Sequence, residues 1–380
     1  MLKSTEISGA SEMSYVVSVV IPVFRESPQL RITLDRLLRQ DVSKEILVVI
    51  DQPTQNSLSL AEEFKRDVKF ILNGERLGKS HALNLAIKNS KGEVLLFLDA
   101  DVEIPEDKSF LRKVVEELED VDLLDIKKEV LKQSFLSKMT YYEYAGFNIG
   151  SWLVTKLAKK SPSINGSAFA IRREVLESLG GFRQVVCEDM DLATRCFMGN
   201  YKVKYAKDLR VLSHVYSSWR KWLDQRKRWA TGIALWLKNW YKPLLAASIK
   251  KPQIFLPALF FLYPSIIIVI LYLLLPASLI YKLLSLALLF IALRLDIAFL
   301  AIPLTTLGTN FLKGIAASLT SFLASATTFY IFAKKLGFNF KLHEFFIYYH
   351  FYSLICLAIT FAGLISVCVF NRQLSFDWKV

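Results

Sequence analysis

Cysteine is scarce in this 380-residue chain, and charged residues are rare in its last third. The four cysteines are scattered and form no Cys-X-X-Cys pair, which argues against a disulfide framework and fits a reducing compartment. We expect no signal peptide, because residues 1–14 are polar and the apolar run that follows is short and ends at Pro22. The N-terminal part is therefore expected in the cytosol, with residues 1–15 disordered.

Ionisable residues become rare from about residue 253 to residue 370, whereas the first 250 residues alternate apolar and charged segments. A boundary is expected near residues 250–252, where two lysines and a proline precede the first long apolar run. Residues 251–380 are thus expected to form a helical transmembrane domain. Three segments have about the 20 residues needed to cross the hydrocarbon core: 254–275, 283–305 and 345–370.

A fourth apolar segment, residues 311–333, has one apolar stripe with serine and threonine residues off it. It predicts either an interfacial helix or a further span packed by small residues. Four spans would place Lys334, Lys335 and Lys341 outside the cell, against the positive-inside tendency. Three spans and an interfacial helix keep that loop cytosolic, and this is the arrangement that we expect.

The net charge of +13 is concentrated before the apolar part, since Lys202 to Lys251 contain thirteen Lys and Arg and only two acids. A basic juxtamembrane segment favours anionic membrane lipids, although it also serves as a plain cytoplasmic retention signal. Nucleic acid is not an expected partner, because the basic segment leads into the bilayer. Residues 133–160 interleave aromatic side chains with lysines. They predict an interfacial helix or a helix packed on the sheet domain.

Four short apolar runs alternate with helical patterns in the first hundred residues. This alternation predicts an α/β domain with a parallel sheet covered on both faces. Ligands of such sheets bind at the carboxyl ends of the strands, where Asp51, Asp99 and Asp101 are expected. The four predicted strands are residues 16–23, 45–51, 68–72 and 93–101.

The Asp99-Ala100-Asp101 motif predicts a site for Mg²⁺ or Mn²⁺. In an extended chain, residues i and i+2 point the same way, so both carboxylates would face one point and Glu103 would continue the pattern. Hard oxygen ligands suit these ions, which also bind substrate phosphates. Acids at strand ends are also common as ordinary loop residues.

Five ordered motifs from residue 16 to residue 230 resemble those of family 2 glycosyltransferases of the cellulose-synthase and hyaluronan-synthase type. The resemblance implies a Rossmann-like GT-A catalytic domain over residues 16–217 and an interfacial helix over residues 218–250. The segments that carry it are VSVVIPVFRE (17–26), GKSHALNLAIKNSKGEVLLFLDAD (78–101), NGSAFAIRREVLESLGGF (165–182), EDMDLATRCFMGNYKVKY (188–205) and QRKRW (225–229).

The resemblance also implies roles for individual residues. Asp51 would contact the nucleotide base, or else would be a turn or cap residue, and Lys79 would lie near the donor diphosphate. Asp101, with Glu103 and His214, would bind the metal. Trp229 and Glu188 would contact the acceptor. The donor-binding residues implied in this way are Pro22, Glu26, Asp51, Lys79, Asp99, Gln225 and Arg228.

Glu188 and Asp189 resemble the catalytic acids of the family, with Cys187 where threonine is commoner. Asp189 would be the general base that takes the proton from the acceptor hydroxyl in one inverting displacement, with Glu188 beside it. The alternative for Asp189 is a helix N-cap. Lone histidines such as His214 are more often structural than metal-binding.

These features predict an inverting, metal-dependent hexosyltransferase with its catalytic domain in the cytosol. It would move a sugar, by analogy mannose from GDP-mannose, to a lipid-linked saccharide, and no obligate protein partner is evident. A small processive polysaccharide synthase that uses a UDP-sugar is the first alternative, because the Gln225–Trp229 motif accompanies processive members. A non-catalytic nucleotide-sugar-binding scaffold is the alternative from another class.

Overall fold

The computed structural model describes residues 16–295 and 301–372, which divide into two compact units. The first unit contains residues 16–129 and 159–214, and the second contains residues 130–158 and 215–372. Residues 1–15, which we expected to be disordered, lie outside the described residues.

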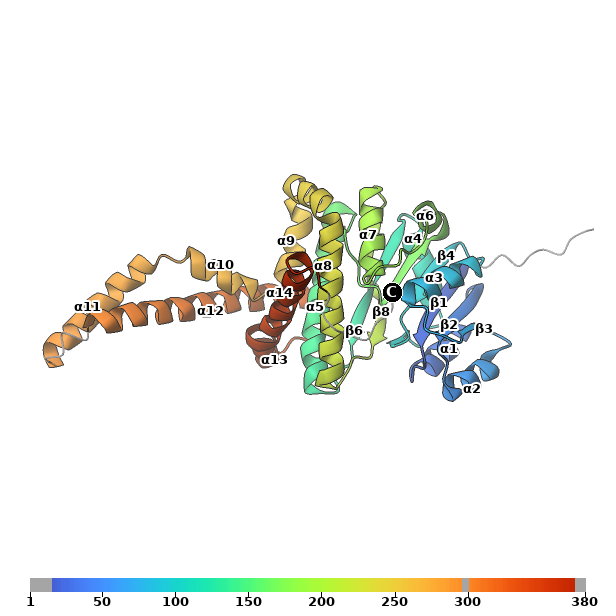
Figure 1. The fold of residues 1–380 in the computed structure, drawn as a ribbon, viewed down its shortest axis with the longest axis horizontal. Coiled ribbons are helices and arrows are strands. Elements are labelled where there is room, and N and C mark those ends of the chain that lie inside the picture. Colours follow the sequence, from blue (N-terminus) through green and yellow to red (C-terminus); the bar gives the residue numbers. More distant parts are fainter. Residues whose placement is uncertain (1–15, 296–300, 373–380) are drawn as a thin grey trace, which may run out of the picture. The chain divides into compact units, whose positions relative to one another are not determined.

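The first unit is built on one eight-stranded sheet with the order β3-β2-β1-β4-β7-β6-β8-β5 (Figure 1). Strands β1 to β4 pair in parallel, as predicted, whereas β7 pairs antiparallel with both β4 and β6. The sheet is therefore mixed, which corrects the prediction of a parallel sheet. The strands are β1 Val17–Phe24, β2 Lys44–Asp51, β3 Lys69–Asn73, β4 Val94–Leu98, β5 Val102–Glu103, β6 Leu123–Val130, β7 Ala168–Arg172 and β8 Val203–Ser213.

Two hydrophobic cores cover the two faces of this sheet, as the period of a strand requires. Val19 and Leu96 belong to one core, and their chain neighbours Val20 and Phe97 belong to the other. Burial on both faces explains why the central strands are continuously apolar. The helices of the unit are α1 Leu30–Leu38, α2 Gln55–Phe64, α3 Lys79–Lys88, α4 Phe110–Leu118, α6 Arg173–Ser178 and α7 Glu188–Met198.

The second unit is helical throughout its regular structure in the described residues. Its helix α8 spans Trp219–Lys250, which agrees with the helix predicted over residues 218–250. The other helical elements are α5 Phe135–Ala158, α9 Pro252–Leu262, α10 Ile266–Leu274, α11 Ala277–Leu295, α12 Ala301–Lys335, α13 Leu342–Ile347, the π-helix η2 Tyr348–Tyr352 and α14 Ser353–Cys368.

Helix α5 belongs to the helical unit. Its Tyr142 is fully buried, packs edge-on against Phe345 and donates a hydrogen bond of 3.0 Å to Glu344. Residues 130–158, which we assigned to the catalytic domain, are therefore part of the helical unit. The choice between an interfacial helix and a helix packed on the sheet domain stays a prediction. Most of the apolar side chains of α5 are buried, and Phe135 and Leu157 near its two ends are exposed.

Within the described residues, two helical stretches are long and apolar enough to cross a membrane: Leu307–Lys335 and Leu342–Cys368. The first contains residues 311–333, for which the sequence predicted either an interfacial helix or a further span. The predicted span 254–275 is divided between α9 and α10, and part of the predicted span 283–305 lies outside the described residues. The number of spans stays a prediction.

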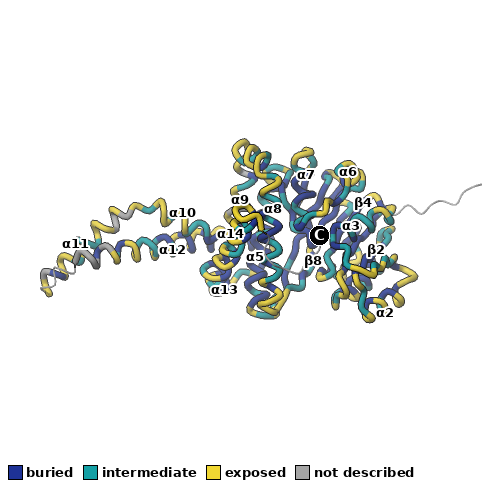
Figure 2. The backbone as a smooth tube through the Cα atoms, viewed as in Figure 1, coloured by how far each residue is buried: buried dark blue, intermediate teal, exposed yellow. Residues whose placement is uncertain are grey.

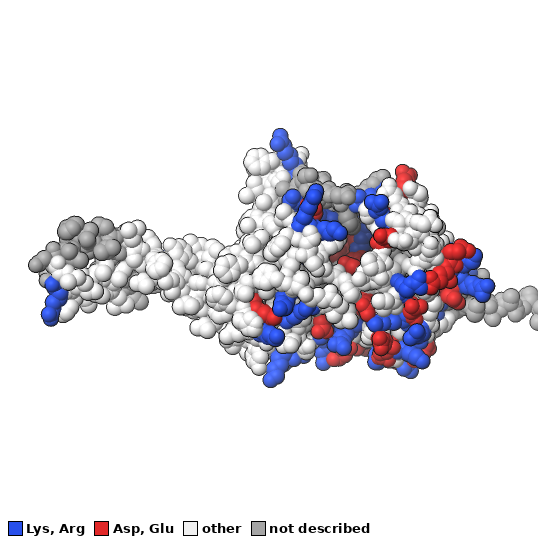
Figure 3. Space-filling view, turned by 90° about the horizontal axis from the view of Figure 1, so that it is seen from below, with Lys and Arg blue, Asp and Glu red and all other residues white. Residues whose placement is uncertain are grey.

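Helices α11 and α12 run side by side (Figure 1), and Figure 2 colours many of their residues as exposed. Several of their large apolar side chains are not covered by any described residue. Leu286, Phe290 and Phe311 are each at least 69% exposed. Charged side chains are sparse on these helices in the face shown by Figure 3. Such an uncovered apolar surface suits lipid rather than water.

Candidate active site

Lys79 joins two of the predicted site acids. It is the first residue of α3, and its Nζ atom lies 2.7 Å from Asp99 Oδ1 and 2.9 Å from Glu188 Oε1. Burial alone would lower the pKa of Lys79, but the charges of Asp99 and Glu188 raise it well above its ordinary value. The ammonium group therefore stays charged and holds the end of β4 against the start of α7.

Asp99 and Asp101 lie on a turn at the end of β4. The N–H of Val102 donates to the carbonyl oxygen of Asp99 at 3.0 Å, which closes the turn. The extended geometry that we expected for this motif is therefore wrong, because the chain leaves the sheet here. The two carboxylates nevertheless remain within electrostatic range of each other.

Asp101 has the electrostatics of a cation ligand. Burial, followed by the nearby charge of Asp99, raises the pKa of Asp101 to about 7. A divalent cation at this place would relieve both costs. Mg²⁺ and Mn²⁺ commonly use one or two protein carboxylates and take further ligands from substrate phosphates, so Asp99 and Asp101 fit the predicted ion.

Glu103 and His214 satisfy each other instead of completing a ligand set. His214 Nε2 lies 2.9 Å from Glu103 Oε2, and Arg36 Nη1 lies 2.6 Å from Glu103 Oε1. Across residues 16–295 and 301–372, no group of three His, Cys, Asp or Glu side chains is placed to hold a metal. In this geometry both oxygens of Glu103 have protein partners, and metal binding by the predicted set of Asp101, Glu103 and His214 stays a prediction.

Asp189 lies in the first turn of α7, where both carboxylate oxygens accept backbone hydrogen bonds. Gly166 donates to Oδ2 at 2.7 Å, and Met190 donates to Oδ1 at 2.8 Å. Burial, followed by the charge of Glu188, raises the pKa of Asp189 to about 6. The N-cap of α7 is Cys187, so Asp189 is not the capping residue that we considered as its alternative.

Glycine is required at position 166 by this contact. A Cβ atom added there would lie 2.5 Å from Asp189 Oδ2, which is closer than real Cβ contacts allow. The segment before β7 therefore passes directly over the carboxylate of Asp189. The predicted donor residue Pro22 lines a small hollow together with Lys79, Asp99, Gly166 and Glu188.

Asp51 shapes a turn. Its Oδ2 atom accepts hydrogen bonds from the backbone of Leu77 at 2.9 Å and of Gly78 at 2.8 Å, and its Oδ1 atom accepts one from Asn73 at 2.8 Å. These are the contacts of the turn residue that we considered as its alternative. Contact with a nucleotide base stays a prediction.

Glu26 likewise has partners within the first unit. Its Oε2 atom accepts hydrogen bonds from Thr54 at 2.6 Å and from Asn56 at 3.2 Å. It therefore ties the loop after β1 to the start of α2, next to the strand end that carries Asp51. Its predicted contact with the donor is not tested by this geometry.

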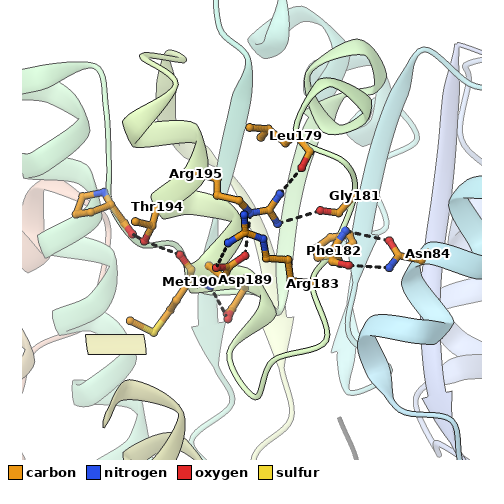
Figure 4. Close-up of polar contacts among 11 residues, drawn as sticks. Asn84, Leu179, Gly181, Phe182, Arg183, Asp189, Met190, Thr194 and Arg195 are labelled. Carbon is orange, nitrogen blue, oxygen red and sulfur yellow. Dashed lines mark hydrogen bonds and ion pairs between the residues drawn. The ribbon is translucent and has the colours of Figure 1, made fainter. Parts of the chain in front are cut away.

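Arg195 is a supporting residue that the sequence did not reveal (Figure 4). It pairs with Asp191 at 2.8 Å and donates to the carbonyl oxygens of Leu179 at 2.7 Å and Gly181 at 2.9 Å. These bonds tie the loop after α6 to the helix that carries Glu188 and Asp189. Only the spacing of Asp191 and Arg195, one helical turn apart, hinted at this pair.

Asn84 holds the same loop from α3. Its side chain donates to the carbonyl oxygen of Phe182 at 2.8 Å and accepts from the N–H of Phe182 at 2.9 Å. Gly181 is needed beside it, because this residue has a φ of +74°. Hydrogen bonds from α3 and from α7 therefore hold this loop beside the helix that carries the site acids.

Gln225, Arg228 and Trp229 lie on α8 in the second unit. Each is half-buried. These three side chains therefore belong to the second unit, whereas the acids Asp99, Asp101 and Asp189 belong to the first. Their joint action on a donor and an acceptor stays a prediction.

Residues 18–180 match a family model described as glycosyl transferase family 2. Among known proteins, the chain is 28% identical over 236 residues to the probable glycosyltransferase YdaM of Bacillus subtilis. It is 26% identical over 228 residues to a poly-beta-1,6-N-acetyl-D-glucosamine synthase of Staphylococcus epidermidis. Each match covers 57% of this chain and 54% of the relative, so the chain spans about half the length of these relatives.

A solved structure also resembles the chain. It is the mannosyltransferase PcManGT of Pyrobaculum calidifontis, in complex with GDP-Man and Mn²⁺, with a TM-score of 0.54 and 20% sequence identity. The match covers 95% of this chain and 89% of that one. The predicted fold is thereby confirmed. The narrower resemblance to cellulose and hyaluronan synthases stays a prediction.

Proposed function

We propose that the chain is a family 2 glycosyltransferase that transfers one hexose from a cytosolic nucleotide sugar to a saccharide on a membrane lipid. The match of residues 18–180 to the model of that family and the GT-A fold support this. Enzymes of this family use an inverting mechanism. The observation that carries the proposal is the ion pairing of Lys79 with Asp99 and Glu188, next to Asp101 and Asp189.

Asp189 is proposed as the general base. The acceptor hydroxyl would form the new bond to the anomeric carbon and give its proton to the carboxylate of Asp189, while the bond to the nucleoside diphosphate breaks. A carboxylate with a pKa of about 6 is a stronger base than an ordinary aspartate and is still ionised at neutral pH. Gly166 and Met190 hold its two oxygens in place.

Asp99 and Asp101 are proposed to hold Mn²⁺ or Mg²⁺. When bound, the metal would act as a Lewis acid that offsets the charge on the departing diphosphate. Lys79, which pairs with Asp99 and Glu188, is proposed to lie beside the phosphates as a fixed cation. Gln225 and Arg228 are proposed to bind the donor, since a guanidinium suits phosphate, and Trp229 to stack on the acceptor sugar.

The donor is proposed to be GDP-mannose, by analogy with lipid-linked glycan assembly and with the neighbour that was solved with GDP-Man. The test is a panel of GDP-, UDP- and dTDP-sugars incubated with Mn²⁺ or Mg²⁺ and scored for release of the nucleoside diphosphate. Release from GDP-mannose alone is expected. Release from a UDP-sugar alone would overturn the donor assignment and leave the family unchanged.

A small processive polysaccharide synthase is the second candidate, supported by the similarity to a polymer-forming synthase of Staphylococcus epidermidis. Sizing the product separates the two: single addition yields one extended acceptor, whereas a processive enzyme yields a ladder of long chains. The non-catalytic scaffold is tested with Asp189→Asn. Loss of turnover in this variant, with nucleotide-sugar binding retained, would support catalysis and exclude the scaffold. If the variant turns over substrate as fast as the parent does, Asp189 is not the base.

The chain is proposed to be an integral membrane protein with its catalytic domain in the cytosol. The two long apolar stretches and the exposed apolar surface of α11 and α12 support this. A Lys341→Cys variant, made in a background without the four native cysteines, tests the topology. Three spans place this residue in the cytosol, so labelling by an impermeant maleimide from outside intact cells would contradict them.

A further inference from the structure

A buried network of charged and polar side chains lies inside the helical unit, around Arg226. Arg226 on α8 is 4% exposed and forms an ion pair with Glu143 on α5, which is 7% exposed. The hydroxyl of Tyr352 donates to Glu143 at 2.9 Å and accepts from Arg226 at 2.9 Å and from Trp222 at 2.8 Å. Every member of this set is thus hydrogen-bonded to another.

Arg226 also contacts two side chains of the Gln225–Trp229 motif. Its Nη1 atom donates to Gln225 Oε1 at 3.0 Å, and its guanidinium carbon lies 4.2 Å from the centre of the Trp229 ring. That separation is typical of a cation–π contact. Phe147 and Tyr144 on α5 lie 6.2 Å and 6.5 Å from the same ring. Trp229 is therefore held by Arg226 and by two aromatic rings.

Stability alone does not explain a buried ion pair. Removing two charges from water is costly, and apolar side chains of similar volume are often at least as stabilising. What such a pair provides is a fixed direction, because the planar guanidinium binds its partners in only a few geometries. Tyr352 closes the π-helix η2, a type of helical turn that is often found at functional sites.

We propose that Arg226 and Glu143 are positioning residues that orient Gln225 and Trp229 for the acceptor and the donor. This inference rests on the proposed function, in which those two side chains bind substrates. Glu143, Tyr352 and Trp222 hold the guanidinium, and the guanidinium holds the indole ring and the amide. Arg226 and Glu143 touch no substrate themselves.

The first test measures the position of Trp229 without any reaction. The full chain is labelled with 5-fluorotryptophan, and the ¹⁹F resonance of Trp229 is assigned among the seven tryptophans with Trp229→Phe. Arg226→Lys keeps the charge but loses the flat stacking surface, and Glu143→Gln removes the counter-charge. Both are expected to shift or broaden this resonance. Arg220→Lys, at an exposed position of the same helix, is the matched control and is expected to leave it unchanged.

The second test separates acceptor use from donor chemistry. In Arg226→Lys and Glu143→Gln, transfer is expected to fall by about tenfold to hundredfold through a higher KM for the acceptor. Hydrolysis of the donor without acceptor is expected to fall much less, because Gln225 is one of several proposed donor contacts, whereas Trp229 is the proposed stacking surface for the acceptor. Tyr352→Phe, which removes only the hydroxyl, replaces Glu143→Gln if that variant does not fold.

The results distinguish the two proposals. An unchanged Trp229 resonance in the folded variants overturns the positioning role whatever the enzyme does. Equal losses of donor hydrolysis and transfer also overturn it, because they indicate a general structural defect. A shifted resonance in a protein whose parent shows no transfer keeps the positioning role and overturns the proposed function instead.

Discussion

Lys79 and Asp99 form an ion pair of 2.7 Å at the edge of the sheet, and the same ammonium group lies 2.9 Å from Glu188. Two acids more than eighty residues apart in the chain thus share one cation. Without it, they would face each other with no counter-charge. The pairing connects the motif after β4 with the motif that opens α7.

Lys79→Met is therefore expected to lower the free energy of unfolding by about 3 kcal/mol, because it leaves partly buried acids unpaired. It is also expected to abolish release of the nucleoside diphosphate. Lys65→Met is the matched control: its partner Glu62 is 71% exposed, and such surface pairs contribute about 0.5 kcal/mol or less. Melting temperatures of both variants check the comparison, and equal values would contradict it.

Transfer is expected to lose activity in mild acid. The base must be ionised, and the pKa of Asp189 is raised to about 6. Below that pH, kcat/KM should therefore fall by about tenfold for each pH unit. A pH–rate profile at saturating metal checks this. A rate that stays constant down to pH 4.5 would show that the base has an ordinary aspartate pKa.

Asp189→Asn is expected to be inactive but more stable than the parent at neutral pH. Because the pKa of Asp189 is higher in the folded chain than its ordinary 3.8, ionisation destabilises the fold as pH rises from about 4 to about 6, and fully above that. The amide removes this cost and can still accept the hydrogen bond from Gly166. It loses only the bond from Met190, because its NH₂ group cannot accept. A rise in melting temperature at pH 7.5 that disappears near pH 4 is the expected result. A lower melting temperature at pH 7.5 would contradict it.

Gly166→Ala is expected to reduce transfer by about a hundredfold or more, because the carboxylate of Asp189 must move to make room for the added methyl group. Gly314→Ala is the matched control, since a Cβ atom there meets nothing within 4 Å. The control should keep full activity. Initial rates with purified variants check both, and an active Gly166→Ala enzyme would mean that Asp189 is not held as described.

The parts of the fold that the sequence predicted depend on local patterns. The apolar runs ending at Asp51 and Asp99 correspond to parallel strands, and α8 has nearly the predicted limits because its basic and aromatic pattern is continuous. The antiparallel strands were missed, since β7 pairs with β4 across more than sixty residues. No local pattern encodes such a pairing.

The candidate site shows the same division. Asp99, Asp189 and Lys79 were found through motifs, whereas the partners of Glu103 were not. Arg36 precedes Glu103 by 67 positions and His214 follows it by 111, and only folding brings them together. Arg226 was likewise one basic residue in a basic run, and its burial against Glu143 could not be read from its neighbours.

The two acids Asp101 and Glu103 are expected to differ in their response to metal. Asp101→Asn should raise the Mn²⁺ concentration needed for half-maximal nucleoside diphosphate release by about tenfold or more, because it removes a ligand charge. Glu103→Gln should instead lower the melting temperature, because Arg36 and His214 lose their shared partner. Titration of each variant with Mn²⁺ checks this. If Glu103→Gln shifts the titration as far as Asp101→Asn does, then Glu103 leaves Arg36 and His214 to bind the metal when the donor is present.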